Sequence, residues 1–204
     1  MSNSINTIIF DWAGVFCTPG EPFSHPIFRE ATGLGPDDVG AKVADIQDLY
    51  YRGRISPAEF WERIIAYFGL SGVTKDDLRQ AYLDSYRLHP DMLPMAAKLT
   101  TAYPTVLLSN LTEEMMHAIE ERHRASEHFQ NAIFSNQVGF VKPEKEIFDL
   151  ALAATGSLPD QTIFIDDSRR NVEAANQLGF KTILFTTPEH CVESLKELGI
   201  RLPS

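Results

Sequence analysis

Short apolar runs rich in β-branched residues recur along the chain, separated by segments with helical patterns. The runs cover residues 7–10, 105–108, 132–134, 162–165 and 181–185. Each run is largely apolar at consecutive positions, so that a strand formed by it would be apolar on both faces. This is typical of strands buried on both faces of a parallel sheet. Helix start and stop signals lie between the later runs, at Pro143 and Gly156 and at Ser168 and Gly179. The pattern predicts an α/β fold with an open parallel sheet flanked by helices.

The first and second runs are separated by about 90 residues, whereas a crossover between parallel strands needs only a dozen or more. This long segment has helical signals of its own. Ser56–Glu59 is a capping box with proline at the first helical position, and the helix that it begins should end at Gly69. Thr74 is a suitable N-cap for a further helix, which we expect over 75–88.

We therefore expect an all-helical insertion over residues 17–88, packed as a small bundle against the sheet. Residues 1–16 and 89–204 would form the α/β core domain. With 204 residues and 44% hydrophobic composition, the chain is long and apolar enough to bury the core that this division requires.

Composition narrows the range of partners. The formal net charge of −10 and the isoelectric point near 5.0 disfavour non-specific attraction to nucleic acid or to an anionic membrane. No run approaches the roughly 20 apolar residues of a membrane span. The two cysteines, Cys17 and Cys191, fit a reducing compartment better than a disulfide scaffold. We expect a soluble cytoplasmic protein without nucleic-acid or membrane partners; composition does not indicate its oligomeric state.

Polar residues directly follow several of the apolar runs, and a lysine lies in the loop beyond the run at 132–134. These residues are Asp11, Ser109 and Asn110, Lys142, and Asp166 and Asp167. In open α/β sheets, ligands bind beyond the carboxyl ends of the strands. A single aspartate or serine at a strand end is usually a turn former or a helix cap. All four positions together indicate a functional site at one edge of the sheet.

The residue types suit the transfer of an anionic group. A carboxylate such as Asp11 can attack phosphorus or carbon and form a covalent intermediate. Because an anionic substrate repels an anionic nucleophile, the site needs cations. Carboxylate and carbonyl oxygens are ligands that Mg²⁺ prefers, and Lys142 would add a second positive charge. The hydroxyl of Ser109 can hold an oxygen of the group that is transferred.

These motifs resemble those of the haloacid dehalogenase superfamily, which is dominated by Mg²⁺-dependent phosphatases with an aspartate nucleophile and a Rossmann-like core. The four motifs stand here as Asp11-Trp12-Ala13-Gly14-Val15, Ser109-Asn110, Lys142-Pro143 and Asp166-Asp167, in the family's order. The helical insertion resembles the small α-helical cap of one subclass. The segments 51–56 and 164–175 are similar to those of sugar-phosphate phosphatases and of the phosphatase domain of epoxide hydrolases.

For the metal, the resemblance implies a Mg²⁺ ion held by the first and fourth motifs. Asp11 would be both nucleophile and ligand, and Ala13 would contribute its carbonyl oxygen. Asp167 matches the other direct ligand, while Asp166 would be a second ligand or an outer-shell partner.

For the substrate, the resemblance implies a small phosphorylated metabolite. Ser109 and Asn110 would bind its phosphate, and Lys142 would neutralise charge. Trp12 borders the nucleophile, so it either lines the substrate pocket or packs beneath the insertion.

Ala13 is the departure from the family pattern. Phosphatases of this family usually carry a second aspartate at that position, which protonates the leaving group and later activates water. An alanine can do neither, and general acid/base catalysis accelerates such steps about 10²–10⁴-fold. We therefore expect a Mg²⁺-dependent hydrolase of small phosphate or phosphonate esters that works through an aspartyl phosphate. It should be slow or unusual, with best turnover of esters whose leaving group needs no protonation.

Three other functions stay open. Phosphonoacetaldehyde hydrolases also resemble the first motif, but they require a cap lysine that forms a Schiff base; Lys42 is the candidate, followed by Lys75. Haloacid dehalogenases attack carbon without a metal, but they lack the acidic pair at 166 and 167, whose repulsion calls for a cation. The third possibility is a catalytically impaired protein that binds phosphate and has a regulatory role.

Overall fold

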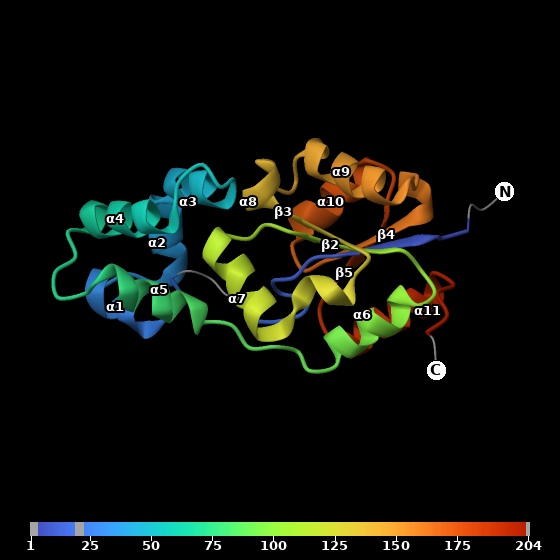
Figure 1. Cartoon of the computed structure of the whole chain (residues 1–204), viewed down its shortest axis with the longest axis horizontal. Coiled ribbons are helices and arrows are strands. Elements are labelled where there is room, and N and C mark those ends of the chain that lie inside the picture. Colours follow the sequence, from blue (N-terminus) through green and yellow to red (C-terminus); the bar gives the residue numbers. More distant parts are fainter. Residues whose placement is uncertain (1–3, 19–22, 203–204) are drawn as a thin grey trace.

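The computed structural model describes residues 4–18 and 23–202, which contain a five-stranded parallel sheet (Figure 1). The strands are β1 (Thr7–Phe10), β2 (Thr105–Ser109), β3 (Asn131–Phe134), β4 (Thr162–Asp166) and β5 (Lys181–Leu184). They lie in the order β3-β2-β1-β4-β5. The five predicted strands are confirmed, with ends within one residue of those read from the sequence.

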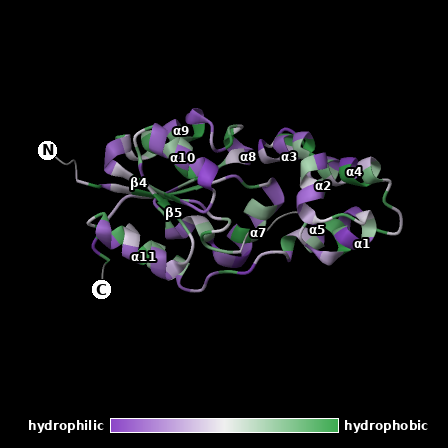
Figure 2. Cartoon of the chain, turned by 180° about the vertical axis from the view of Figure 1, so that it is seen from behind, coloured by the Kyte–Doolittle hydropathy of each residue, from purple (hydrophilic) through white to green (hydrophobic). Residues whose placement is uncertain are grey.

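Helices cover both faces of this sheet. They are α6 (Met92–Thr100), α7 (Glu113–His123), α8 (Ser135–Val138), α9 (Lys145–Thr155), α10 (Arg169–Gln177) and α11 (Pro188–Glu197). Side chains alternate along β1, so that Ile9 joins the cluster under α9 and α10, while Ile8 and Phe10 join the larger cluster on the opposite face. The strands β4 and β5 are accordingly coloured as hydrophobic in Figure 2. The predicted Rossmann-like arrangement is confirmed.

Five helices between β1 and β2 gather in a separate lobe, at the left of Figure 1. They are α1 (Pro26–Thr32), α2 (Pro36–Lys42), α3 (Ala44–Tyr51), α4 (Pro57–Phe68) and α5 (Lys75–Leu83), and we call them the helical lobe. The domain boundaries at 16/17 and 88/89 stay a prediction. Residues 1–3, 19–22 and 203–204 of the predicted division lie outside the described residues.

Two predicted helices have different ends. The helix expected over 75–88 ends at Leu83, because the hydroxyl of Ser85 donates to the carbonyl oxygen of Tyr82 (2.6 Å) and the chain then turns toward Thr18. The Thr18 amide donates to the Arg87 carbonyl (2.8 Å), and the chain around Arg87 is extended rather than helical. The helix expected from Pro143 begins at residue 145, since Glu144 is its extended N-cap. Over residues 4–18 and 23–202, no helix is long and apolar enough to span a bilayer.

Candidate active site

The strand order places the end of β1 between the ends of β2 and β4. Phe10 pairs with Leu107 of β2 and with Ile165 of β4. Asp11, the next residue, therefore lies beside the ends of both neighbouring strands, where Ser109 and Asp166 stand. The connections that leave β1 and β4 run in opposite directions, to β2 and to β5, and open α/β sheets bind ligands at such a point.

Asp11 is buried and held in a single orientation by three donors. Its Oδ1 atom accepts hydrogen bonds from the hydroxyl of Ser109, the backbone amide of Trp12 and the ammonium of Lys142, each at 2.7 Å. No donor among the described residues reaches Oδ2. One oxygen of Asp11 is thus fixed in place, and the other remains available to a ligand.

Lys142 links two buried carboxylates. Its Nζ atom lies 2.7 Å from Asp11 Oδ1 and 2.7 Å from Asp166 Oδ2. The backbone of Lys142 is bound by Asn110, whose Oδ1 accepts from the Lys142 amide (2.8 Å) and whose Nδ2 donates to the Lys142 carbonyl (3.1 Å). The side chain of Asn110, which the sequence predicted to bind phosphate, therefore holds the backbone of Lys142 in place.

Asp166 and Asp167 are adjacent but differ in their surroundings. Asp166 is fully buried and accepts hydrogen bonds from the Ser168 amide (2.8 Å) and from Nδ2 of Asn171, 3.1 Å from each carboxylate oxygen. Asp167 is exposed. Our sequence interpretation did not assign Asn171 to the site; its position one helical turn beyond the acidic pair was the signal that could have identified it.

Gly14 allows Asp167 to approach the first motif. A Cβ atom at Gly14 would lie 2.0 Å from Asp167 Oδ2, and the residue has a φ of +80°, which side-chain-bearing residues rarely adopt. The Asp167 carboxylate therefore rests against the bare backbone of the loop after β1. Only glycine at position 14 permits this contact.

The cluster carries more negative charge than its lysine balances. Asp11, Asp166 and Asp167 each offer an oxygen, and these oxygens lie within 4.8 Å of one another. Burial raises the pKa of Asp11 to about 7, and the charge of Asp166 adds to this effect while Lys142 opposes it. Burial lowers the pKa of Lys142, but the two carboxylates outweigh it and raise the pKa above that of an ordinary lysine. Clustered carboxylate oxygens with surplus charge fit a hard divalent cation such as Mg²⁺.

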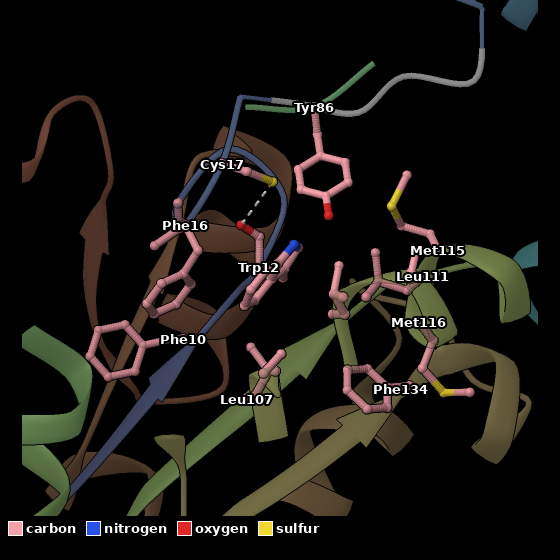
Figure 3. Close-up of a cluster of buried hydrophobic side chains, with 14 of the residues drawn as sticks. Phe10, Trp12, Phe16, Cys17, Tyr86, Leu107, Leu111, Met115, Met116 and Phe134 are labelled. Carbon is pink, nitrogen blue, oxygen red and sulfur yellow. Dashed lines mark hydrogen bonds between the residues drawn. The ribbon is translucent and has the colours of Figure 1, made fainter. Parts of the chain in front are cut away.

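Trp12 and Ala13 of the first motif have different environments. Ala13 is partly exposed, and its methyl group cannot donate a proton. The side chain of Trp12 is 1% exposed and its ring stacks on Phe16, with ring centroids 5.4 Å apart (Figure 3). Trp12 therefore lies in the hydrophobic core, which is the second of the two placements expected from the sequence, and its role in substrate binding stays a prediction.

A cavity of about 310 Å³ lies beside the site, between the helical lobe and the sheet. The lobe contributes residues of α3, among them Gln47 and Tyr51, and the core contributes Asn110, Lys142 and Arg170. Polar and charged side chains thus form much of its wall. A small polar group attached to a phosphate at Asp11 fits these surroundings.

The two lysines considered for Schiff-base chemistry lie outside this cavity. Lys42 is exposed at the end of α2. Lys75 pairs with Glu62 on the surface of the helical lobe, with Nζ and Oε1 2.5 Å apart. Neither lysine is in a desolvated pocket, which a Schiff-base lysine needs to lower its pKa.

Comparisons with known proteins indicate the family of this chain. A family model described as a haloacid dehalogenase-like hydrolase matches residues 5–179. The D-ribitol-5-phosphate phosphatase of Bacteroides thetaiotaomicron is 26% identical and aligns over 98% of this chain and 100% of its own length. A sesquiterpene phosphatase of Aspergillus oryzae is 24% identical over 97% and 98% of the two chains. The (S)-2-haloacid dehalogenase 4A of Burkholderia cepacia is 26% identical, over 61% and 58%.

Solved structures share the fold. A HAD family enzyme from B. thetaiotaomicron, in complex with magnesium and inorganic phosphate, superposes with a TM-score of 0.77 at 23% identity, covering 91% of this chain and 96% of that chain. A HAD-like hydrolase from Porphyromonas gingivalis gives 0.79 at 24% identity, over 97% and 98%.

Proposed function

The chain belongs to the haloacid dehalogenase-like hydrolase family, and from this premise we propose that it is a Mg²⁺-dependent phosphatase that uses Asp11 as its nucleophile. The observation that carries the proposal is the convergence of Asp11, Lys142 and the acidic pair 166–167 at one edge of the sheet. Relatives aligned over nearly their whole length are named phosphatases, which supports phosphate over a halogenated substrate.

Each residue has a distinct role in this reaction. The Asp11 carboxylate attacks phosphorus, the ester oxygen departs, and water then attacks the aspartyl phosphate and releases inorganic phosphate. Ser109 and Lys142 orient Asp11, and both would bind the phosphoryl oxygens of the substrate. Asp166 accepts a hydrogen bond from Lys142 and so keeps its ammonium in place.

We assign the metal site to Asp11, Asp167 and the carbonyl oxygen of Ala13, with Asp166 beside them. Asp166 already accepts several hydrogen bonds, whereas Asp167 is exposed, so Asp167 is the better direct ligand. When bound, Mg²⁺ supplies positive charge that lets an anionic substrate approach an anionic nucleophile.

Ala13 determines which esters this site can hydrolyse well. With alanine at this position, the leaving oxygen must take its proton from water or depart as a stable anion. The site therefore suits acyl, enol or aryl phosphates better than alkyl phosphates. Ala13 also favours a second candidate function, phosphate binding without turnover.

The cavity supports a small, polar phosphorylated metabolite as substrate. The helical lobe would act as the cap that selects it, and we expect no nucleic-acid or membrane partner. Cys17 and Cys191 are both buried free thiols, which supports a reducing, cytoplasmic location.

A substrate panel with and without Mg²⁺ tests the proposal. It comprises p-nitrophenyl phosphate, acetyl phosphate, D-ribitol 5-phosphate, phosphonoacetaldehyde and 2-chloropropionate. We expect Mg²⁺-dependent phosphate release, fastest with acetyl or p-nitrophenyl phosphate. Metal-independent chloride release would overturn the proposal, and borohydride trapping of phosphonoacetaldehyde on Lys42 would replace it. Phosphate binding without any turnover would favour the second candidate.

A further inference from the structure

The end of α3 and the residues after it make close contact with the core. The hydroxyl of Ser135, at the start of α8, donates to the carbonyl oxygen of Tyr51 at 2.7 Å. A Cβ atom at Gly53 would lie 2.1 Å from the carbonyl oxygen of Asn136. The φ of Gly53 is +65°, so glycine is required both by the backbone conformation and by the contact. We call residues 51–53 the docking segment.

Arg52, in the middle of the docking segment, reaches across to the core with its guanidinium group. Its Nη1 and Nη2 atoms donate to the two carboxylate oxygens of Glu144, at 3.0 and 2.7 Å, and Nη1 also donates to the carbonyl oxygen of Gly139 at 3.2 Å. Asp48, one turn earlier on α3, accepts from Nε at 2.8 Å. The bidentate pair fixes the orientation of both side chains.

The segment that Arg52 holds is the one that carries Lys142. Gly139 and Glu144 bracket this loop, and Glu144 Oε2 also accepts from the amide of Val141 at 3.0 Å. Asn110 binds the backbone of Lys142 from the side of the core. The loop is therefore held from two sides, by Asn110 of the core and by Arg52 of the helical lobe.

Both members of the pair stay charged near neutral pH. Hydrogen bonds from Arg52 lower the pKa of Glu144, and those to Glu144 and Asp48 raise the pKa of Arg52. The side chain of Glu144 is 34% exposed, and such partly solvated pairs contribute little to stability. The geometry of the pair therefore matters more for the position of the loop than for folding.

We propose that Arg52 is a positioning residue, which acts through Glu144 to keep Lys142 aligned with Asp11 when the helical lobe is seated on the core. Arg52 lines the same cavity as Lys142, and its guanidinium group donates to Asp48, to Glu144 and to the Gly139 carbonyl. The docking segment thereby couples the seating of the lobe to the catalytic lysine. A kinetic test of this role rests on the proposed phosphatase activity, whereas a test by amide exchange does not.

The kinetic test compares Arg52→Met with Arg63→Met, using p-nitrophenyl phosphate and Mg²⁺. Arg63 is a matched control, since it forms its ion pair with Glu59 inside α4 rather than across to the core. We expect Arg52→Met to lower kcat about 10- to 100-fold with KM nearly unchanged, because a small misalignment of a catalytic group has effects of this size. Arg52→Lys should retain intermediate activity, since an ammonium cannot make the bidentate pair. A raised KM with unchanged kcat would overturn the proposal by making Arg52 a substrate-binding residue.

A second pair of variants tests the contact at Gly53. In Gly53→Ala the new Cβ meets the Asn136 carbonyl, whereas Gly69 has a similar φ of +60° and a Cβ added there would have nothing within 4 Å. Both substitutions strain the backbone equally, so only the contact with the core differs. Gly53→Ala should lower kcat as Arg52→Met does, and Gly69→Ala should not. Equal kcat in the two variants would count against coupling through the docking segment.

Amide hydrogen exchange provides a readout that needs no turnover. We expect faster exchange in residues 139–144 of Arg52→Met than in the wild type or Arg63→Met, with the strands unchanged. Identical exchange in this loop would overturn the positioning role. If the wild type hydrolyses no phosphate ester, the proposed function fails while this measurement still decides the role of Arg52.

Discussion

Glu114 and Asp11 are both buried carboxylates near the junction of the helical lobe and the sheet, but the groups around them balance their charge differently. Glu114, on α7, accepts hydrogen bonds from Trp61 Nε1 (2.9 Å) and Arg79 Nε (3.0 Å), which come from α4 and α5. Each of its oxygens thus has a donor, and one cation matches one carboxylate. Asp11 shares a single ammonium with Asp166, and a third carboxylate lies within 4.8 Å.

We infer that this difference in charge balance distinguishes a structural carboxylate from a functional one. A matched carboxylate connects two parts of the fold, as Glu114 connects α7 to the helical lobe. An under-neutralised cluster raises the free energy of the folded protein, which is typical of sites that await a cation or a substrate. We infer that surplus charge, rather than burial alone, distinguishes the Asp11 cluster as the reactive one.

The largest expected effect follows from removing the charge of the proposed nucleophile. Asp11→Asn should lower Mg²⁺-dependent turnover of p-nitrophenyl phosphate on the order of 10⁴-fold or more, because an amide cannot form the aspartyl phosphate. Without Mg²⁺ its midpoint of thermal unfolding should equal or exceed that of the wild type, since the substitution relieves repulsion. A large drop in the midpoint would show that the two centres do not differ as we infer.

At Glu114, in contrast, we expect removal of the carboxylate to destabilise the folded protein. Glu114→Ala should reduce the free energy of unfolding by about 3 kcal/mol, because it leaves the Trp61 N–H buried without an acceptor and separates α7 from the lobe. Urea denaturation measures this change. Glu113→Ala, at an exposed neighbouring position, is the control and should change stability by less than about 0.5 kcal/mol. Equal effects of the two substitutions would contradict a structural role for Glu114.

Ala13→Asp should restore the missing acid to the reactive centre. We expect turnover of D-ribitol 5-phosphate or another alkyl phosphate to rise about 10²-fold, the lower end of what general acid/base catalysis supplies. Acetyl phosphate needs little protonation, so its turnover should change much less. The ratio of the two kcat/KM values measures the effect. A uniform loss for both substrates would mean that position 13 cannot accommodate another carboxylate.

Magnesium should stabilise the reactive centre specifically. At 100 times its dissociation constant, Mg²⁺ should raise the free energy of unfolding by about 2.7 kcal/mol, which thermal unfolding detects without any substrate. Asp167→Asn should remove this increase, whereas Asp76→Asn, on the exposed first turn of α5, should retain it. An increase that survives Asp167→Asn would exclude Asp167 as a ligand. Chelation by EDTA should abolish turnover.

The smallest effect concerns pH. Burial raises the pKa of Glu114 above its ordinary value of 4.5, although Trp61 and Arg79 oppose the shift. Below pH 4.5 the group is protonated in both states; as the pH rises toward the folded pKa, only the unfolded chain loses the proton, so stability decreases. Glu114→Gln should remove this decrease, which a series of urea denaturations from about pH 4 to 7 would detect. A parallel pH dependence in both proteins would mean that other groups cause it.

Local patterns in the sequence were sufficient to predict the strands and the polar residues at their ends that the structure brings together. The five apolar runs predicted the strands, because short runs that are apolar on both faces are typical of strands buried inside a parallel sheet. Asp11, Ser109 and the pair at 166 and 167 follow strand ends, so parallel strand direction places them at the same edge of the sheet. The strand order, with β1 between β2 and β4, then makes them neighbours. The end of the helix expected to reach Leu88 was not predictable, because contacts with Thr18 decide it.

The sequence by itself determined the strands, the helical insertion and the order of the four motifs, since each depends on residues that are near one another along the chain. Only the tertiary structure decided that Trp12 lies in the core, that Asn110 holds the backbone of Lys142, and that Arg52 pairs with Glu144. These contacts join residues far apart in sequence, and their geometry depends on how the helical lobe packs against the sheet. Side-chain direction is a property of that packing, which no local pattern encodes.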